Sequence, residues 1–358
     1  YRRNNWRSSL LRGLRVIPVR MHPVQYNPVT KEMRIIHRFC ITVRFEGTDL
    51  RNASSRPMRP VSRSWARLMR PLILNYDELG LDEVPVGSYL IVCENDANLV
   101  NNLLSPLIDW KTRKGHVVEV ETFSPGSSNS TIKSIIQNAY NTWEIPPEFV
   151  LLVGDTNGNY TLPGWSPSGI DHPYSQLDGT DILADVAIGR LPVENATEVM
   201  AQTNKVLWYE KMPYIANMSW YHQGCLVAGS SYSGISTIQT NRWIKTRMIW
   251  NEYTRIDTFW YNMGTSSVNT TIVNAINAGV SFVNYRGWIG MENFSLSSIE
   301  GLVNGYMLPF VTTLTCGTGG FDGSTESFME HFVTVGTPSL PKAAVGCIGT
   351  ATSSTHTR

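Results

Sequence analysis

From about residue 85 onward, short apolar runs alternate with amphipathic segments, and this alternation constrains the fold more than any other feature of the sequence. Runs such as SYLIVCEN (88–95), EFVLLVGD (148–155) and PFVTTLTC (309–316) are largely apolar on successive residues, which is typical of strands buried on both faces. Between them apolar residues recur every three or four positions, as at Ile132, Ile136 and Ala139, which is typical of helices. The pattern predicts an α/β fold with mostly parallel sheets and helices on both faces.

The alternation runs through two rounds, which predicts two α/β units in tandem, over residues 85–218 and 219–358. Residues 1–60 differ, because apolar residues there alternate with polar ones around a turn at YNPVTKE (26–32). We interpret this part as the end of a β-sandwich whose earlier strands are absent. Residues 61–84 continue an Arg-rich segment, and this composition predicts that they form an exposed linker.

Charge is divided unequally along the chain. Residues 1–70 carry 16 Lys and Arg against 3 Asp and Glu, a net charge of +13, and the remainder has a net charge of −12. We expect the basic N-terminal part to dock on the acidic body, and we expect salt to weaken this docking. Nucleic-acid binding is the alternative, which the acidic remainder disfavours. No apolar run approaches the roughly 20 residues that a membrane span needs.

Cys316 stands where an apolar run ends and three of the next four residues are glycine. Ligands of open parallel sheets bind at the carboxyl ends of the strands, so a thiol there is well placed to attack a carbonyl group. Bare backbone N–H groups at such a turn can stabilise an oxyanion. The alternative is a small packed residue, which is our interpretation of Cys40, Cys93, Cys225 and Cys347. Five cysteines without a CxxC pair argue against a disulfide framework and a cysteine zinc site.

Several segments of the chain resemble the gingipain family of cysteine peptidases, which belongs to the caspase- and legumain-like group. They are FVLLVGD (149–155), LDGTDILADVAIGRLP (177–192), AGVSFVNYRG (278–287), TLTCGTGGF (313–321) and AAVGCIGTATSS (343–354). The segment LRGLRVIPVRMHPVQYNPVTKEMRI (11–35) resembles the end of that family's propeptide.

The resemblance implies a peptidase that is secreted or held at the surface of a Gram-negative bacterium, usually through type IX secretion. It also implies a two-part, caspase-like α/β domain and a β-sandwich prodomain, as in a zymogen. It implies a Cys–His dyad in which Cys316 is the nucleophile. Its partners would be protein or peptide substrates, its own propeptide and other fragments of the same precursor, and no cofactor is required.

The sequence departs from the family at the catalytic histidine. Family members have Gly-His-Gly after the strand that ends in VNY, whereas this chain has NYRGWIG, with Trp288 at the histidine position. His356 follows the next apolar run after Cys316, so we predict that it replaces the missing base. The oxyanion would be held by backbone N–H groups near Gly287, Trp288, Ile289 and Gly317. The alternative is an inactive pseudopeptidase that serves as a surface binding or structural protein.

Three acidic residues complete the candidate site. The resemblance aligns Asp171 with the acid that binds the substrate arginine in Arg-specific gingipains, which predicts cleavage after Arg or Lys. The alternative is a loop aspartate that caps a turn. Asp178 and Asp181 supply hard oxygens suited to a structural calcium ion, and an Asx turn is the alternative for them.

Overall fold

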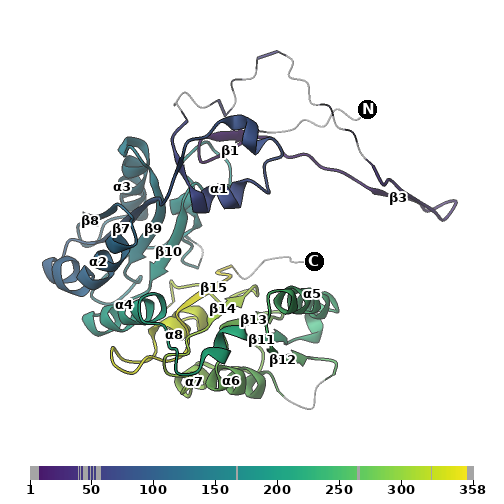
Figure 1. Ribbon diagram of the computed structural model, residues 1–358. Helices are drawn as coiled ribbons and strands as arrows, with labels where there is room; N and C mark the ends of the chain where they lie inside the picture. The colour runs from purple at the N-terminus through teal and green to yellow at the C-terminus, as the bar shows by residue number, and fades with distance from the viewer. Residues whose placement is uncertain are drawn as a thin grey trace.

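The computed structural model describes residues 8–38, 40, 42, 47–48, 50, 52–53, 58–166, 168–263, 267–323 and 325–352. Two parallel sheets form the body, each in its own unit (Figure 1). The first has the strand order β10-β9-β7-β8 and the second the order β12-β11-β13-β14-β15. Every pairing within them is parallel, so the predicted tandem α/β fold is confirmed.

The first unit holds β7 (Ser88–Glu94), β8 (Val118–Phe123), β9 (Pro147–Val153) and β10 (Ala187–Leu191). Helix α3 (Asn129–Thr142) covers one face, while α2 (Ser105–Arg113), α4 (Ala196–Glu210) and the π-helical turn Leu99–Leu103 cover the other. Pro106 lies in the first turn of α2, where N–H groups make no hydrogen bond within the helix. Its lack of an N–H therefore costs nothing there, and a new helix begins at this point. Asn195 caps α4 by accepting the N–H groups of Thr197 and Glu198.

The second unit holds β11 (Gln223–Ala228), β12 (Arg255–Trp260), β13 (Phe282–Arg286), β14 (Phe310–Thr313) and β15 (Gly346–Gly349). Helices α6 (Val268–Ala278), α7 (Leu296–Glu300) and α8 (Phe328–Thr334) pack on one face around the largest core, and α5 (Ser236–Trp250) covers the other. The central register aligns Val283 of β13, Val311 of β14 and Cys347 of β15.

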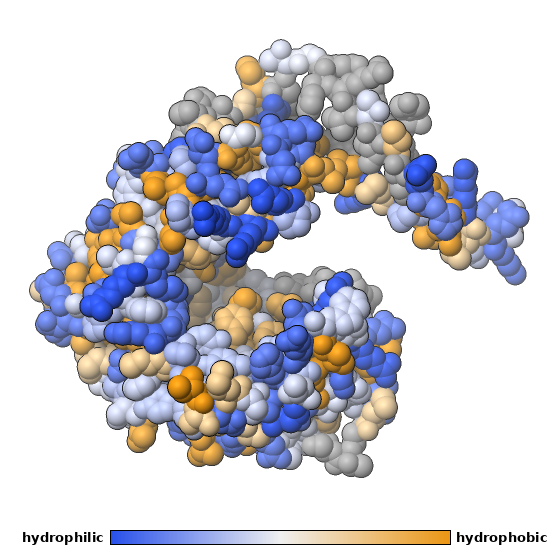
Figure 2. All heavy atoms as spheres, in the orientation of Figure 1, coloured by the Kyte–Doolittle hydropathy of each residue, from blue (hydrophilic) through white to orange (hydrophobic). Residues whose placement is uncertain are grey.

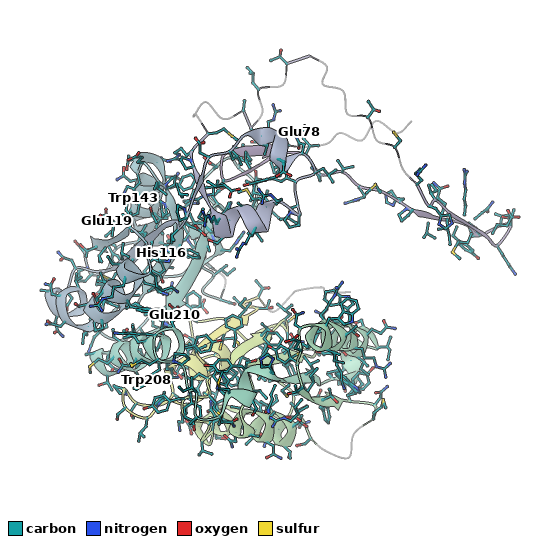
Figure 3. The ribbon with its side chains drawn as sticks, in the orientation of Figure 1. Glu78, His116, Glu119, Trp143, Trp208 and Glu210 are labelled. Carbon is teal, nitrogen blue, oxygen red and sulfur yellow. The ribbon has the colours of Figure 1, made fainter. Side chains whose placement is uncertain are left out.

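Helix α4 joins the two units. Its Trp208 (Figure 3) packs against Tyr306 of the second unit, with the two rings tilted and their centroids 4.7 Å apart. The buried Lys205 donates from Nζ to the carbonyl of Val333 at 2.8 Å. Asn204 donates to the carbonyl of Pro338 at 3.1 Å. The units are therefore held together by packing and by hydrogen bonds from one face of this helix.

The described N-terminal residues form two antiparallel hairpins, β1 (Ser9–Leu11) with β2 (Leu14–Val16) and β3 (Val24–Asn27) with β4 (Glu32–Ile35). The second hairpin turns at residues 28–31, as YNPVTKE predicts, and projects from the body with both of its strands exposed (Figure 2). These small sheets confirm a β-rich N-terminal part.

The segment 61–84 is not the exposed linker that its composition predicts. It forms β5 (Val61–Ser62), α1 (Arg63–Met69), the 3-10 turn Tyr76–Leu79 and β6 (Glu83–Val84). Trp65, Met69 and Tyr76 are buried in a small core that also contains Leu14 of the first hairpin. The prediction was wrong because apolar residues spaced along the arginine-rich helix give it a buried face.

Within the described residues, no helix combines the length and apolar content needed to cross a bilayer.

Candidate active site

The carboxyl ends of the second sheet bring together the residues that follow β13 and β14. All five strands are parallel, so their carboxyl ends share one edge of the sheet. Gly287, Trp288 and Ile289 follow β13, and Cys316 follows β14. Ile289 and Cys316 form an isolated parallel bridge, and the N–H of Gly290 donates to the carbonyl of Cys316 at 2.8 Å. The structure therefore places the loop that carries Trp288 beside the candidate nucleophile.

A tight turn follows Cys316 and is held by the buried Thr318. The Thr318 hydroxyl donates to the carbonyl of Thr315 at 2.9 Å and accepts the hydroxyl of Thr313 at 2.7 Å. Gly317 adopts a φ of +68°, a backbone conformation that favours glycine. Cys316 is partly exposed at this turn. Sequence reasoning missed Thr318, although a threonine two residues after the thiol is a visible candidate for closing the turn.

Two of the predicted oxyanion donors have acceptors within the protein. The N–H of Gly287 donates to Oγ1 of Thr315 at 3.0 Å, and the N–H of Gly317 donates to the carbonyl of Thr352 at 3.2 Å. Ser233 also binds this loop, because its hydroxyl donates to the carbonyl of Gly287. Trp288 and Ile289 are 50% and 61% exposed, so their side chains face solvent beside the thiol. The oxyanion role of these residues stays a prediction.

The positions of the described histidines do not change the prediction for the catalytic base. Four described histidines have a ring nitrogen hydrogen-bonded elsewhere: His116 to the Gly87 carbonyl, His172 to the Ile182 carbonyl, His222 to the Glu252 carbonyl and His331 to the Glu326 carboxylate. His116 belongs to the first unit (Figure 3), and His22 and His37 belong to the exposed N-terminal part. His356 lies outside the described residues, so its role as the base stays a prediction.

The other cysteines differ in burial. Cys93 and Cys225 are fully buried, as predicted for packing residues, and burial raises the pKa of the Cys93 thiol to about 12. Cys347 is partly buried and packs against the core of the second unit, as predicted for a packing residue, and burial raises the pKa of its thiol to about 12. Cys40 is exposed, so the prediction that it is a packing residue was wrong.

Asp171 is engaged inside the protein. Arg190 donates to it with two parallel hydrogen bonds, from Nε to Oδ2 at 2.8 Å and from Nη2 to Oδ1 at 2.7 Å. Both carboxylate oxygens are therefore occupied by a guanidinium group of the chain itself. The role of Asp171 in binding a substrate arginine stays a prediction, and a substrate would have to compete with Arg190.

Asp178 and Asp181 contact the first unit's own helix and the N-terminal hairpin. Asp178 accepts the hydroxyl of Tyr140 at 2.7 Å, and Asp181 accepts the N–H groups of Leu10 at 2.6 Å and Leu183 at 2.9 Å. In the described parts of the chain, no group of three or more His, Cys, Asp or Glu side chains is arranged to hold a metal ion. The bond from the N–H of Leu183 is the Asx turn that the sequence offers as the alternative for Asp181, and calcium binding by these two residues stays a prediction.

Similarity to known proteins agrees with this geometry. The family model for peptidase family C25 matches residues 83–358, and the model for the C25 propeptide matches residues 5–58. The chain belongs to peptidase family C25. It is 27% identical to gingipain R2 of Porphyromonas gingivalis over 95% of this chain and 47% of that protein. It is 26% identical to Lys-gingipain W83 of the same organism over 96% of this chain and 20% of that protein. The chain therefore spans about half or less of these relatives.

Solved structures show the same fold. The crystal structure of the Arg-specific cysteine proteinase gingipain R matches with a TM-score of 0.66 and 24% identity, over 75% of this chain and 63% of that one. The complex of the pro- and mature domains of Porphyromonas gingivalis RgpB matches with a TM-score of 0.68 and 22% identity, over 75% and 65%. The gap between the two family models, residues 59–82, is the folded segment around α1.

Proposed function

We propose that this C25 chain is the precursor form of a cysteine endopeptidase that uses Cys316 as its nucleophile. The Cys316 sulfur would bond to the carbonyl carbon of the scissile peptide, and the amine would leave with a proton supplied by the base. Water would then hydrolyse the thioester and regenerate the thiol. His356 is our candidate for the base, and we propose that the protein acts outside the cell or at its surface.

The observation that supports this proposal best is the position of Cys316. It is partly exposed at the shared carboxyl edge of five parallel strands, on a glycine-containing turn, beside the loop after β13. Ligand sites of open parallel sheets occur at this edge, and a thiol needs such access to attack a peptide carbonyl. The buried Cys93 and Cys225 lack that access.

Cleavage after Arg or Lys is the finer part of the proposal. It rests on the names of the relatives, whereas Asp171, the acid that the resemblance assigns to the substrate arginine, is already paired with Arg190. Because Arg190 occupies both oxygens of Asp171, we expect any arginine preference of this chain to be weaker than an unpaired carboxylate would give.

Site-specific labelling tests the proposal. The full chain, cut between its N-terminal part and its body, is treated with a thiol-reactive peptidyl probe, and labelled sites are read by peptide mass spectrometry. We expect labelling at Cys316, its loss in Cys316→Ala, and strong reduction in His356→Ala. Labelling that survives His356→Ala would remove that histidine from the mechanism.

Trp288 supports the second candidate, a pseudopeptidase that binds through this edge. Its indole cannot transfer a proton at neutral pH, and it lies exposed one residue from the bridge to Cys316. A wild-type chain whose Cys316 reacts with a small alkylating reagent but with no peptidyl probe would favour this candidate.

A further inference from the structure

Arg190, at the carboxyl end of β10, is an internal anchor for several segments of the first unit. Besides its two bonds to Asp171, its Nη1 donates to the carbonyls of Gly154 at 2.7 Å and Leu162 at 2.8 Å. The Arg190 side chain is only 6% exposed and that of Asp171 16% exposed. A guanidinium with this many directed bonds in a shielded place is held in one orientation.

The flat face of that guanidinium supports Phe321, which belongs to the other unit. The Arg190 guanidinium carbon lies 4.2 Å from the centroid of the Phe321 ring. The first unit also holds the Phe321 backbone, because its N–H donates to the carbonyl of Ser168 at 3.3 Å and its carbonyl accepts the hydroxyl of Thr156 at 2.8 Å. Phe321 is thus fixed through both its ring and its backbone.

Two glycines of the first unit make room for the ring. A Cβ at Gly164 would lie 2.8 Å from Cε2 of Phe321, and one at Gly169 would lie 2.9 Å from Cδ2. Both separations are shorter than carbon atoms tolerate, so the ring fits only against bare backbone. The ring is therefore matched to this place by its shape as well as by its contact with the guanidinium.

Phe321 is five residues after Cys316, and the chain between them is held at its other end by the second sheet. Thr318 closes the turn, and the N–H of Gly319 donates to the carbonyl of Thr350 at 3.1 Å. The loop that carries the thiol is therefore anchored on its own sheet by Thr318 and on the neighbouring unit by Phe321.

We propose that the Asp171–Arg190 pair is a positioning site for Cys316 rather than a pocket for a substrate side chain. The pair holds Phe321, and Phe321 sets the path of the Cys316 loop relative to the loop after β13. This inference rests on the proposed function only in taking Cys316 as the reactive thiol. Its structural consequence, a loop immobilised through Phe321, holds whether or not the chain cleaves peptides.

The test uses the full chain, cut as above, with the variants Phe321→Leu and Asp171→Asn. Phe282→Leu is the matched control, because Phe282 is also half-buried but begins β13 at the opposite edge of the same sheet. Labelling rates at Cys316 are measured with iodoacetamide, which needs only access to the thiol, and with two peptidyl probes that end in arginine and in alanine. Hydrogen exchange is followed in the peptide that covers residues 314–322.

We expect Phe321→Leu and Asp171→Asn to slow both peptidyl probes by about tenfold or more, because small misplacements of reacting groups reduce rates steeply. Their iodoacetamide rates should stay within about twofold of wild type, since access to the thiol is unchanged. Amide exchange in 314–322 should rise by about tenfold, as local opening becomes easier. Phe282→Leu should change neither the probe rates nor this exchange, and Phe321→Tyr, which keeps the ring, should recover most of the loss.

Two results would overturn the inference. In the first, Asp171→Asn slows only the arginine probe, which would make Asp171 a substrate-binding residue. In the second, exchange in 314–322 is unchanged in both variants, which would show that the pair does not hold the loop. A wild-type chain that reacts with no peptidyl probe would refute the proposed function alone, because the exchange measurement would still decide the positioning role.

Discussion

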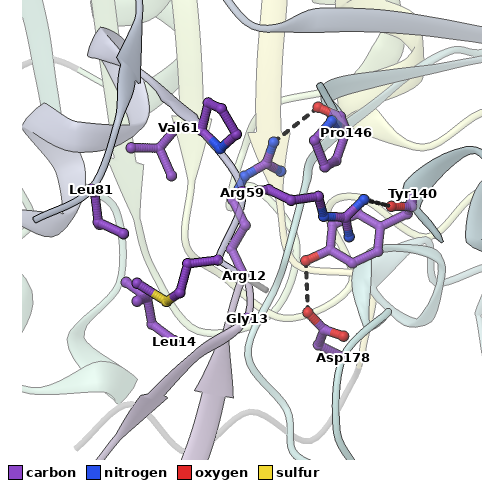
Figure 4. A pocket seen from close by; sticks show the side chains of 11 residues that line it. Arg12, Gly13, Leu14, Arg59, Val61, Leu81, Tyr140, Pro146 and Asp178 are labelled. Carbon is purple, nitrogen blue, oxygen red and sulfur yellow. Dashed lines mark hydrogen bonds between the residues drawn. The ribbon is translucent and has the colours of Figure 1, made fainter. Parts of the chain in front are cut away.

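Arg12 should hold the N-terminal hairpin on the body, and Arg12→Met tests this. The Arg12 guanidinium donates from Nη1 to the carbonyls of Pro147 and Asp185, both at 2.9 Å. It also donates from Nη2 to the carbonyl of Pro146 at 3.0 Å, the bond from Arg12 that Figure 4 draws. It also lies 5.2 Å from the centroid of the Trp65 ring. All three acceptors belong to buried residues of the first unit.

The expected loss follows from these contacts. A hydrogen bond from a charged group contributes about 1.5–3 kcal/mol, and three bonds from one guanidinium are not additive. Allowing for that, we expect Arg12→Met to lower the free energy of hairpin opening by about 3–4 kcal/mol, which corresponds to roughly 10²–10³ in the opening equilibrium.

Hydrogen exchange measures this opening directly. The N–H of Leu10 donates to the Asp181 carboxylate at 2.6 Å, and the main-chain N–H of residue 12 donates to that of Asp185 at 2.7 Å. Both amides should therefore exchange about 10²–10³ times faster in Arg12→Met. The control is Arg15→Met, which removes the same charge from an exposed position of the same hairpin.

The control also tests the charge argument from the sequence. If general attraction between the basic N-terminal part and the acidic body holds the hairpin, Arg15→Met should match Arg12→Met, and both should depend strongly on salt. If the buried contacts of Arg12 hold the hairpin instead, Arg12→Met should have the larger effect of the two, and its effect should depend only weakly on salt. Equal effects of the two variants would refute our reasoning.

Three other predictions concern pH and the missing base. Burial lowers the pKa of Lys205 to about 7, so the native state binds fewer protons than the unfolded state between about pH 7 and 10, and stability should rise with pH across that window by on the order of 4 kcal/mol. Lys205→Met should abolish this slope in urea unfolding at pH 7, 8.5 and 10, and a retained slope would contradict the assignment. Burial raises the pKa of Glu210, but hydrogen bonds from Lys111 and Lys114 outweigh it and hold the pKa at about 2. The stabilisation from this carboxylate is therefore present above about pH 4.3 and lost toward pH 2. Glu210→Gln should therefore lower the unfolding temperature at pH 7 by several degrees and at pH 2.5 by much less; an equal loss at both values would argue against the ion pair. Trp288→His should raise the rate of peptidyl-probe labelling at Cys316 at least about tenfold if the absence of a base limits this rate in the wild type. An unchanged rate would indicate that another group already acts as the base.

The sheets could be predicted because each strand and helix carries a local periodic signal. Helix α3 buries Ile132, Ile136 and Ala139, as their spacing in the sequence predicts. The carboxyl edge beside Cys316 follows from parallel pairing alone. These features depend on residues close together in the sequence.

The contacts that occupy Asp171 could not be predicted in the same way. Asp171 and Arg190 are 19 residues apart, and the ring that covers the guanidinium comes from residue 321 in the other unit. Nothing local in the sequence shows that a carboxylate is already neutralised by a partner brought to it by the fold. The folded state of residues 61–84 was missed because the apolar residues of α1 lie among arginines, and the core that buries them is completed by Leu14 of the first hairpin.

The folded state of that segment affects how a precursor of this kind would be processed. A processing enzyme binds its substrate as an extended strand, whereas Arg63 and Arg67 lie within α1, whose Trp65 and Met69 are buried. Cutting there first requires the helix to unwind, so the rate of maturation would follow the small fraction of molecules in which it has done so. A substitution that loosens this core, far from the thiol, would then increase the rate at which the precursor is cut.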